Sequence, residues 1–246
     1  KEEQLGEILA NEDMRVRLKA QFELVKRGNK SVKIFQQQLQ QKTKQLARVH
    51  AIWGISQLAR KDAVQAAILL PYLTDADDEI RAQVAKWLGD IRYKPAGEKL
   101  LPLLKDSFSR ARFFAAEALG RIAYEPAVQP IIEMLKANND EDAYLRHAGS
   151  LALSRIGKAE PIIALAKDSS RALRIAAVVS LRRMGNPAVA NFLSDKDEFI
   201  VTEAARAIND DLSIEAALPA LGDLLNKTSF KNEALTRRMI NANLRV

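Results

Sequence analysis

Residues 73–91 read LTDADDEIRAQVAKWLGDI, and residues 104–122 repeat the pattern as LKDSFSRARFFAAEALGRI. In both stretches an aspartate precedes an arginine by six residues, and the arginine opens a run of apolar residues at helical spacing. The motif returns about every 31 residues, a period typical of a solenoid built from stacked helix pairs. The four aspartate–arginine pairs are Asp75/Arg81, Asp106/Arg112, Asp140/Arg146 and Asp168/Arg174.

Aligning the repeats on this arginine shows where the core should lie. The seventh residue after the arginine is apolar in six repeats: Leu24, Ile55, Leu88, Leu119, Leu153 and Leu181. Small or apolar residues also occupy the third position, so one face of the second helix in each pair should be buried. Shorter apolar stretches, such as 66–73 and 128–135, predict the first helices. Four second helices end near Gly89, Gly120, Gly157 and Gly185, which predicts left-handed caps.

These patterns predict an all-α fold, an α-α superhelix of about seven helix pairs. Because a solenoid grows by addition around one continuous core, residues 1–246 are expected to form a single domain. The chain begins with Lys1, and a helical pattern runs to its last residue, so we expect a segment of a longer protein. The glutamine-rich residues 29–47 carry a weak stripe of Ile34, Phe35, Leu39 and Leu46. We interpret them as the first helix of the second repeat, with a disordered insert as the alternative.

Composition narrows the chemistry that these residues can perform. The chain has no cysteine, which excludes disulfides, thiolate zinc sites and a cysteine nucleophile within it. Net charge is +7, and no aspartate or glutamate occurs between Glu23 and Asp62. Nine basic residues fill that window: Lys26, Arg27, Lys30, Lys33, Lys42, Lys44, Arg48, Arg60 and Lys61. Such a window suits nucleic acid or another anionic partner, or else forms a solvated face. The apolar runs fall far short of the ~20 residues that span a bilayer, so no membrane insertion is expected.

The aspartate–arginine spacing has a structural interpretation. The aspartate is expected in the tight turn between two helices, and the arginine in the first turn of the second helix. The two can pair within one repeat or between neighbouring repeats, and either arrangement would form a ladder along the stack. We therefore assign these eight residues to a structural ladder and to helix capping, in preference to ligand binding.

The helix pairs, with this aspartate and arginine placement, resemble HEAT repeats over roughly residues 10–225. A closer resemblance is carried by QLARVHAIWGI at residues 45–55, with RVR at 15–17 and RRMI at 237–240. These segments look like the HEAT region of large bacterial proteins in which a sorbosone-dehydrogenase-like β-propeller precedes the repeats and a c-type haem domain follows. The resemblance implies a periplasmic or secreted location, with a cytoplasmic location as the alternative, and any redox activity would lie in those other domains.

Candidate partner-binding residues lie on the second helices, at positions that point away from the predicted core stripe. They combine aromatic residues with arginines, the usual anchors of protein interfaces. The candidates are Trp53, Trp87, Phe114, Arg121, Arg155 and Arg183, and His50 is expected on the same side. The alternative is that Trp53 and Trp87 pack between repeats while the arginines are merely solvated.

The sequence favours a non-catalytic interaction domain. His50 and His147 lie three repeats apart and neither belongs to a His-Glu pair such as HEAT-repeat di-iron hydroxylases use. Nucleophile and phosphate-loop motifs are also missing, so no catalytic residue, metal site or cofactor is predicted. The expected partner is a protein, either a neighbouring domain of a larger exported bacterial protein or another chain. The main alternative is a nucleic-acid-binding protein similar to HEAT-like DNA glycosylases. A bilin-lyase-like enzyme is a third hypothesis, resting on fold analogy alone.

Overall fold

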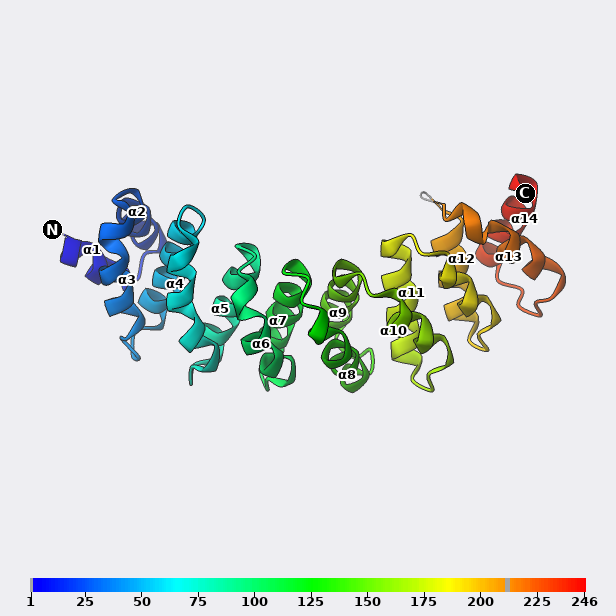
Figure 1. Cartoon of the computed structure of the whole chain (residues 1–246), viewed down its shortest axis with the longest axis horizontal. Coiled ribbons are helices and arrows are strands. Elements are labelled where there is room, and N and C mark those ends of the chain that lie inside the picture. The colour runs from blue at the N-terminus through cyan, green and yellow to red at the C-terminus, as the bar shows by residue number, and fades with distance from the viewer. Residues whose placement is uncertain (1, 211–212) are drawn as a thin grey trace. The chain divides into compact units, whose positions relative to one another are not determined.

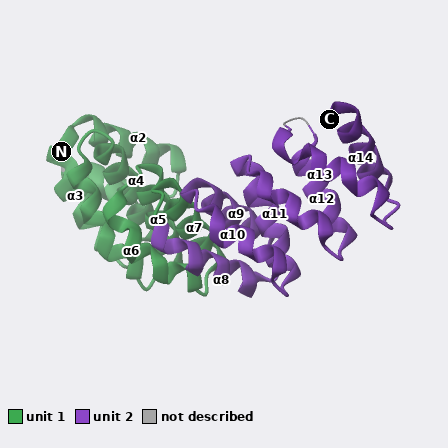
Figure 2. Cartoon of the chain, turned by 45° about the vertical axis from the view of Figure 1, so that its right-hand side comes forward, with its two compact units in different colours: residues 1–124 green, residues 125–246 purple. Residues whose placement is uncertain are grey.

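The computed structural model describes residues 2–210 and 213–246, and every regular element in them is a helix (Figure 1). The chain divides into two compact units, residues 1–124 and residues 125–246 (Figure 2). The all-α, helix-pair architecture predicted from the repeat is therefore confirmed. The sequence predicted one domain over residues 1–246, and the structure places a division after Tyr124 within that range.

Unit 1 contains four helix pairs, each with a long second helix. The second helices are α2 (Met14–Lys26), α4 (Gln45–Ala59), α5 (Asp78–Asp90) and α7 (Ser109–Arg121). The first helices are shorter, and several are 3₁₀ helices, labelled η. In chain order they are α1 (Glu2–Ile8), η1 (Gly28–Ser31) with α3 (Val32–Leu39), η2 (Ala63–Thr74), and η3 (Lys94–Ala96) with α6 (Gly97–Leu100) and η4 (Leu101–Lys105).

Unit 2 repeats this plan with four more pairs. Its second helices are α9 (Ala143–Ile156), α11 (Arg171–Met184), α12 (Glu198–Ile208) and α14 (Glu233–Arg245). Its first helices are η5 (Glu125–Ala127) with α8 (Val128–Asn138), α10 (Ala159–Ala164) with η6 (Leu165–Lys167), η7 (Pro187–Ser194), and η8 (Glu215–Ala217) with α13 (Leu218–Asp223) and η9 (Leu224–Asn226). The described residues thus form eight pairs where the sequence predicted about seven, because the sequence analysis predicted no first helix before the repeat of Arg17, where the structure has the short α1.

The predicted core stripe is buried in both units. The six residues at the seventh position after the repeat arginine are all 0% exposed: Leu24, Ile55, Leu88, Leu119, Leu153 and Leu181. Burying each of these side chains contributes about 1.5–3 kcal/mol. Several first helices are wound as 3₁₀ helices, and Pro71 lies inside η2 while Pro187 opens η7. Pro71 lacks the N–H that an α-helical turn at its position requires, whereas Pro187 lies in a first turn, where proline is tolerated.

The four glycines predicted to cap second helices divide into two groups. Gly157 and Gly185 are left-handed caps of α9 and α11, with φ of 80° and 62°. Gly89 and Gly120 lie inside α5 and α7, so the cap prediction is wrong for both.

The role of Gly89 is close helix packing. A Cβ atom at Gly89 would lie 2.6 Å from the Cα atom of Ala118 in α7, closer than such atoms approach. The absence of a side chain therefore lets α5 and α7 come together. The left-handed turns after these two helices fall instead on Arg92 and Ala123, each with φ of 53°.

The glutamine-rich window contains the predicted first helix. Ile34, Phe35 and Leu39 are buried on α3, as expected from the stripe. Leu46 is 46% exposed in the first turn of α4, so its assignment to the same stripe is wrong. The turn at residues 40–44 separates the two helices and breaks the helical spacing that the stripe assumed.

Candidate interaction surface

The repeat arginines bond in two directions. Arg81 donates from Nη1 to the backbone carbonyl of Asp75 at 2.8 Å, and from Nε to Oδ2 of Asp106 at 2.7 Å. Arg174 does the same in unit 2: its Nη1 lies 2.9 Å from the carbonyl of Asp168, and its Nε lies 2.6 Å from Oδ2 of Asp195. The aspartate six residues earlier is thus contacted through its backbone, and the carboxylate that pairs with the arginine comes from the following repeat.

The carboxylates of this ladder also bond to their own turns. Oδ1 of Asp75, Asp106 and Asp168 accepts the backbone N–H two residues later, at 2.7–2.9 Å. The hydrogen bond from Arg81 is the main cause that lowers the pKa of Asp106 below its ordinary value. Burial raises the pKa of Asp75, but hydrogen bonds from Arg48 and the turn outweigh burial and hold the pKa below its ordinary value.

Two of the predicted ladder arginines differ from this arrangement. Arg112 donates to the carbonyls of Asp106 and Ser107, at 2.6 and 3.1 Å. Arg146 pairs with the carboxylate of its own Asp140 at 2.5 Å. The backbone of Asp140 is left-handed, with φ of 66°, which separates this turn from the others in conformation.

His50 lies at the buried end of a polar network in unit 1, although the sequence placed it on the outer side of α4. Its ring is 2% exposed. Arg17 donates from Nε to Nε2 of His50 at 3.0 Å, so Nδ1 carries the proton and donates to Oε1 of Gln21 at 2.8 Å. Burial, followed by the charge of Arg17, lowers the pKa of His50 to about 4. His50 is therefore a neutral structural residue that joins α4 to α2.

Trp53 and Trp87 are half-buried and lie against each other across α4 and α5. Their ring centroids are 6.5 Å apart, and the Trp53 ring lies 4.9 Å from that of His50. Nε1 of Trp53 donates to Oε1 of Gln83 at 2.8 Å. Nε1 of Trp87 is covered and has no hydrogen-bond partner among the described residues. The two indoles thus pack between repeats and also form part of the second-helix surface.

The network continues from α5 to α7. Gln83 donates from Nε2 to Oε1 of Glu79 at 2.7 Å, and Oε2 of Glu79 accepts from Arg110 at 3.2 Å. The Arg110 guanidinium lies 5.5 Å from the ring centroid of Phe114, which is half-buried and meets Phe113 edge to face. Polar and aromatic contacts therefore connect four successive second helices, α2, α4, α5 and α7.

Cations border this aromatic strip, which we define as Trp53, Trp87 and Phe114. Nζ of Lys86 lies 4.2 Å from the Trp87 ring centroid, and the Arg60 guanidinium lies 5.8 Å from it. Asp90 binds Lys86 at 2.7 Å and Arg121 at 3.1 Å, so two of the bordering charges are held in place.

The other two candidate arginines belong to unit 2. Arg155 is exposed near the end of α9, and Arg183 is exposed at the end of α11. Arg183 lines a hollow of about 650 Å³ together with Val178, Val179 and Ile214. The structure thus places Trp53, Trp87, Phe114 and Arg121 on unit 1 and the remaining two candidates on unit 2.

The basic window is split between two ends of the helix pairs. Asn29 donates to Oδ2 of Asp62 at 3.0 Å, which brings the turn after α2 beside the turn after α4. Five exposed cations lie near these turns: Lys26, Lys30, Lys33, Arg60 and Lys61. Lys42 and Lys44 lie in the turn between α3 and α4, at the other end of these antiparallel helices. Arg48 is buried and paired with Asp75, and Arg27 is paired with Glu23.

Sequence reasoning missed the polar members of the network. Gln21, Glu79, Gln83 and Arg110 carry no motif that marks them. One signal was present: the second position after the repeat arginine reads His50, Gln83 and Phe114 in three successive repeats of unit 1. That column, followed across repeats, would have predicted a row of contacting side chains.

Residues 2–210 and 213–246 contain neither a clustered metal site nor a helix suited to cross a membrane. No cluster of three or more histidine, cysteine, aspartate or glutamate side chains there is arranged to hold a metal ion. Over the same residues, no helix combines the length and apolarity that a membrane span needs.

Comparison with known proteins identifies the repeat. Residues 66–154 match the family model for HEAT repeats. No curated protein matches the chain. Among solved structures, Escherichia coli YibA aligns with a TM-score of 0.57 and 18% identity, over 99% of this chain and 92% of that one. An archaeal HEAT-like repeats protein from Thermococcus onnurineus NA1 aligns with a TM-score of 0.52 and 13% identity, over 78% of this chain and 90% of that one.

A third structure is a complex. The complex of CpcE and CpcF of phycocyanin lyase from Nostoc sp. PCC7120 aligns with a TM-score of 0.51 and 18% identity, over 98% of this chain and 93% of that one. At these identities the likeness shows the fold alone. Residues 66–154 are therefore HEAT repeats, and the described residues outside them continue the same all-α helix-pair architecture.

Proposed function

We propose that this chain is a non-catalytic scaffold that binds a protein partner on the second-helix surface of α4, α5 and α7. The observation that carries the proposal is the aromatic strip of Trp53, Trp87 and Phe114, bordered by Arg60, Lys86 and Arg121. Aromatic and arginine side chains supply most of the binding energy in protein interfaces.

The strip is held rigid before any partner arrives. Trp53 is fixed by its hydrogen bond to Gln83, and Phe114 by Phe113 and Arg110. Side chains that are already ordered lose less entropy on binding, which favours affinity. Each ring also keeps part of its surface open to solvent. This combination of a fixed and partly exposed aromatic surface suits a partner-binding role.

The same network supports a non-catalytic role. Glu79 and Asp90, the carboxylates beside the strip, are bound to Gln83 and Arg110 and to Lys86 and Arg121, respectively. His50 has both ring nitrogens engaged. A general acid or base needs a proton-transferring atom within reach of a substrate, and these groups are occupied by the protein itself. Turnover at a saturable site by the purified chain would contradict this part of the proposal.

A capture experiment tests the surface. The wild-type chain, a Trp87→Ala/Phe114→Ala variant and a Tyr144→Ala control are immobilised and incubated with extract of the source cells. Tyr144 is 78% exposed on unit 2, so the control removes an aromatic ring outside the strip. We expect a protein retained by wild type and control, and reduced more than about tenfold by the double variant. Equal retention by all three proteins, each verified as folded by circular dichroism, would reject the strip as the binding surface.

We further propose that the partner is a neighbouring domain of a larger exported bacterial protein. The resemblance of residues 45–55 to the HEAT region of such proteins supports this proposal. The test is to locate the full-length protein by cell fractionation and antibody detection. Recovery in the periplasmic or secreted fraction, in a polypeptide longer than these residues, is the expected result. Recovery only in the cytoplasm would reject the export proposal.

A second candidate function, nucleic-acid binding similar to HEAT-like DNA glycosylases, is favoured by one observation. The five exposed cations around Asn29 and Asp62 gather at one end of the helix pairs in unit 1. Binding through phosphate contacts should weaken steeply as salt rises. Titration of a labelled random duplex at 50 and 200 mM salt distinguishes the functions, since no binding at 50 mM salt would remove this candidate.

A further inference from the structure

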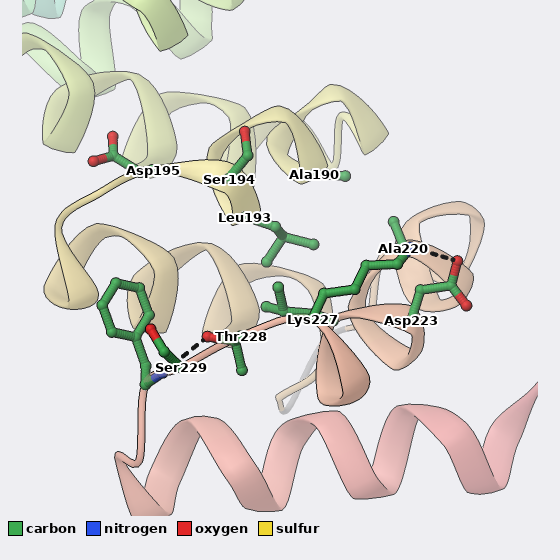
Figure 3. A pocket seen from close by; sticks show the side chains of 11 residues that line it. Ala190, Leu193, Ser194, Asp195, Ala220, Asp223, Lys227, Thr228 and Ser229 are labelled. Carbon is green, nitrogen blue, oxygen red and sulfur yellow. Dashed lines mark hydrogen bonds and ion pairs between the residues drawn. The ribbon is translucent and has the colours of Figure 1, made fainter.

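Unit 2 contains hollows that differ in how far their charges are neutralised. One hollow, of about 530 Å³, lies between η7 and the segment that follows α13 (Figure 3). Lys227 on its wall pairs with Asp223 at 3.5 Å, and Asp195 pairs with Arg174 at 2.6 Å. Its charged residues therefore already have partners within the protein.

The hollow beside Arg183 is different. It has a volume of about 650 Å³ and lies between the C-terminal halves of α11 and α12, next to Ser213 and Ile214. Val178, Val179, Ala207 and Ile214 give it an apolar wall, and Arg182 and Arg183 are exposed at its edge. Neither arginine forms an ion pair with any residue that the structure describes.

The other charged groups near this hollow are already bound. Glu203, on its α12 side, lies 3.7 Å from Arg206, which also binds Asp210 at 3.3 Å. Arg245 donates to Ser213 at 2.7 Å and lies 3.6 Å from Glu215. Among the described residues of the lining, Glu203 is the one carboxylate and already has a cation of its own, whereas Arg182 and Arg183 have no ion-pair partner among those residues.

From this arrangement we propose that the hollow binds an acidic peptide segment of a partner protein, with an aliphatic or aromatic side chain inserted beside one or two carboxylates. The apolar wall would bury the inserted side chain, and Arg182 and Arg183 would pair with the carboxylates in bidentate geometry. A volume of this size falls within the usual range of ligand sites, roughly 300–1,000 Å³. The occupant is therefore a short segment with an apolar centre and an acidic edge.

Charge complementarity selects a peptide over nucleic acid as the occupant. Two arginines around an apolar hollow match a side chain flanked by carboxylates, whereas duplex binding uses longer rows of phosphate contacts and little apolar burial. The inference rests on the proposed scaffold function but not on the aromatic strip, because the hollow lies wholly in unit 2.

Fluorescence anisotropy tests the site with a defined probe. The probe is a fluorescein-labelled 10-residue peptide in which aspartate and glutamate alternate with leucine and phenylalanine. One control peptide carries lysine in place of the acidic residues, and another carries serine in place of the apolar residues. The test variant is Arg182→Gln/Arg183→Gln in the full chain. Its matched control is Lys167→Gln/Lys196→Gln, which removes two exposed charges of unit 2 away from the hollow.

We expect the acidic probe to bind and both control peptides to bind at least tenfold more weakly. The arginine double variant should weaken binding of the probe about tenfold or more, and the lysine double variant less than twofold. Val179→Asn should weaken binding without changing its salt dependence, because it alters only the apolar wall.

Three results would overturn the proposal. They are no binding of the probe at 50 mM salt, equal weakening by the two double variants, and equal competition by a duplex of the same total charge. The outcome is independent of the aromatic strip, since a Trp87→Ala/Phe114→Ala chain should bind the probe like wild type. Unchanged partner capture by that chain, with probe binding retained, would be failure of the proposed surface alone. Loss of partner capture by that chain, with no probe binding to wild type, would be failure of this site alone.

Discussion

The two units have the same helix-pair plan but different second-helix surfaces. In unit 1 the second position after the repeat arginine carries His50, Gln83 and Phe114, and these side chains form a polar and aromatic network. In unit 2 the same position after Arg146 and Arg174 carries Ala148 and Ala176, both 0% exposed.

The helices α9 and α11 of unit 2 approach each other closely. The hydroxyl of Ser180 on α11 donates to the carbonyl of Ala176 in its own helix at 2.7 Å, and its oxygen lies only 3.2 Å from the backbone carbonyl of Ser150 on α9. Arg182 and Arg183 lie in the last turn of α11. The second position after the repeat arginine therefore carries network side chains in unit 1 and buried alanines in these two repeats of unit 2.

The largest expected effect comes from the ladder. Asp195→Asn should reduce the free energy of unfolding by about 3–5 kcal/mol, because it leaves the buried Arg174 guanidinium without its counter-charge. Asp13→Asn, which removes the charged partner of the exposed Arg15 in unit 1, should have a far smaller effect, because solvent screens this pair. Urea denaturation of both variants measures the difference, and similar losses would show that burial does not determine the strength of the pairs.

Core truncation should affect both units alike. Leu119→Ala in unit 1 and Leu153→Ala in unit 2 should each cost about 2–5 kcal/mol, since both side chains are 0% exposed. Leu244→Ala, at a side chain that is 81% exposed on α14, should cost far less. Thermal unfolding followed by circular dichroism checks all three. A loss for Leu244→Ala equal to the core losses would contradict the exposed position of this side chain on α14.

Between pH 7 and pH 5, a pH effect on the free energy of unfolding should arise in unit 1, at His50. Because the pKa of folded His50 is lowered to about 4, the unfolded chain binds its proton first on acidification. The stability from neutral His50 is complete above about pH 6.5 and is lost as pH falls toward 4, on the order of 3 kcal/mol in all. His50→Gln should remove this dependence of the free energy of unfolding on pH, while keeping a hydrogen-bond donor and an acceptor at the site.

The measurement is the urea midpoint of wild type and His50→Gln at pH 7 and pH 5. Protection of the backbone amides of α2 and α4 against hydrogen exchange should decrease over the same pH range in wild type. An unchanged slope in the variant would show that acid sensitivity arises elsewhere, for example from the ladder aspartates.

The smallest effect should be Trp53→Phe. It removes the hydrogen bond from Nε1 to Gln83 while keeping an aromatic ring, so we expect a loss of about 1 kcal/mol. The same change should lower partner capture only slightly, since the ring surface remains. A loss above about 3 kcal/mol would indicate that the network sets the position of whole helices.

The sequence predicted the architecture because the apolar column at the seventh position repeats in six of the eight pairs that the described residues form. Leu88 and Leu119 could be assigned to the core without a structure, since the helical period alone fixes their side. The sequence could not show which carboxylate pairs with each arginine. Pairing within one repeat and pairing between neighbouring repeats both place Asp75 and Arg81 at the same turn. Only the positions of neighbouring turns show that Arg81 reaches the carboxylate of Asp106.

The site was less predictable than the core for a similar reason. The outward positions of Trp53 and Trp87 follow from helix geometry, but their mutual contact depends on how α4 stacks on α5. His50 was placed on the surface, and neighbours from α2 cover it. The sequence predicts a helix cap at Gly89. In the structure this glycine instead lets α5 approach Ala118 of α7 closely, a contact that no local sequence pattern reveals.

Site-specific photocrosslinking tests the protein-binding role of unit 1 most directly. Phe114→p-benzoylphenylalanine places a reactive ring in the aromatic strip, and the same change at Tyr144 provides an exposed control on unit 2. After irradiation of cells that express each chain, the predicted result is a discrete protein adduct at position 114 that is absent at position 144. A nucleic-acid adduct at position 114, or no adduct that distinguishes the two positions, would contradict the proposed surface.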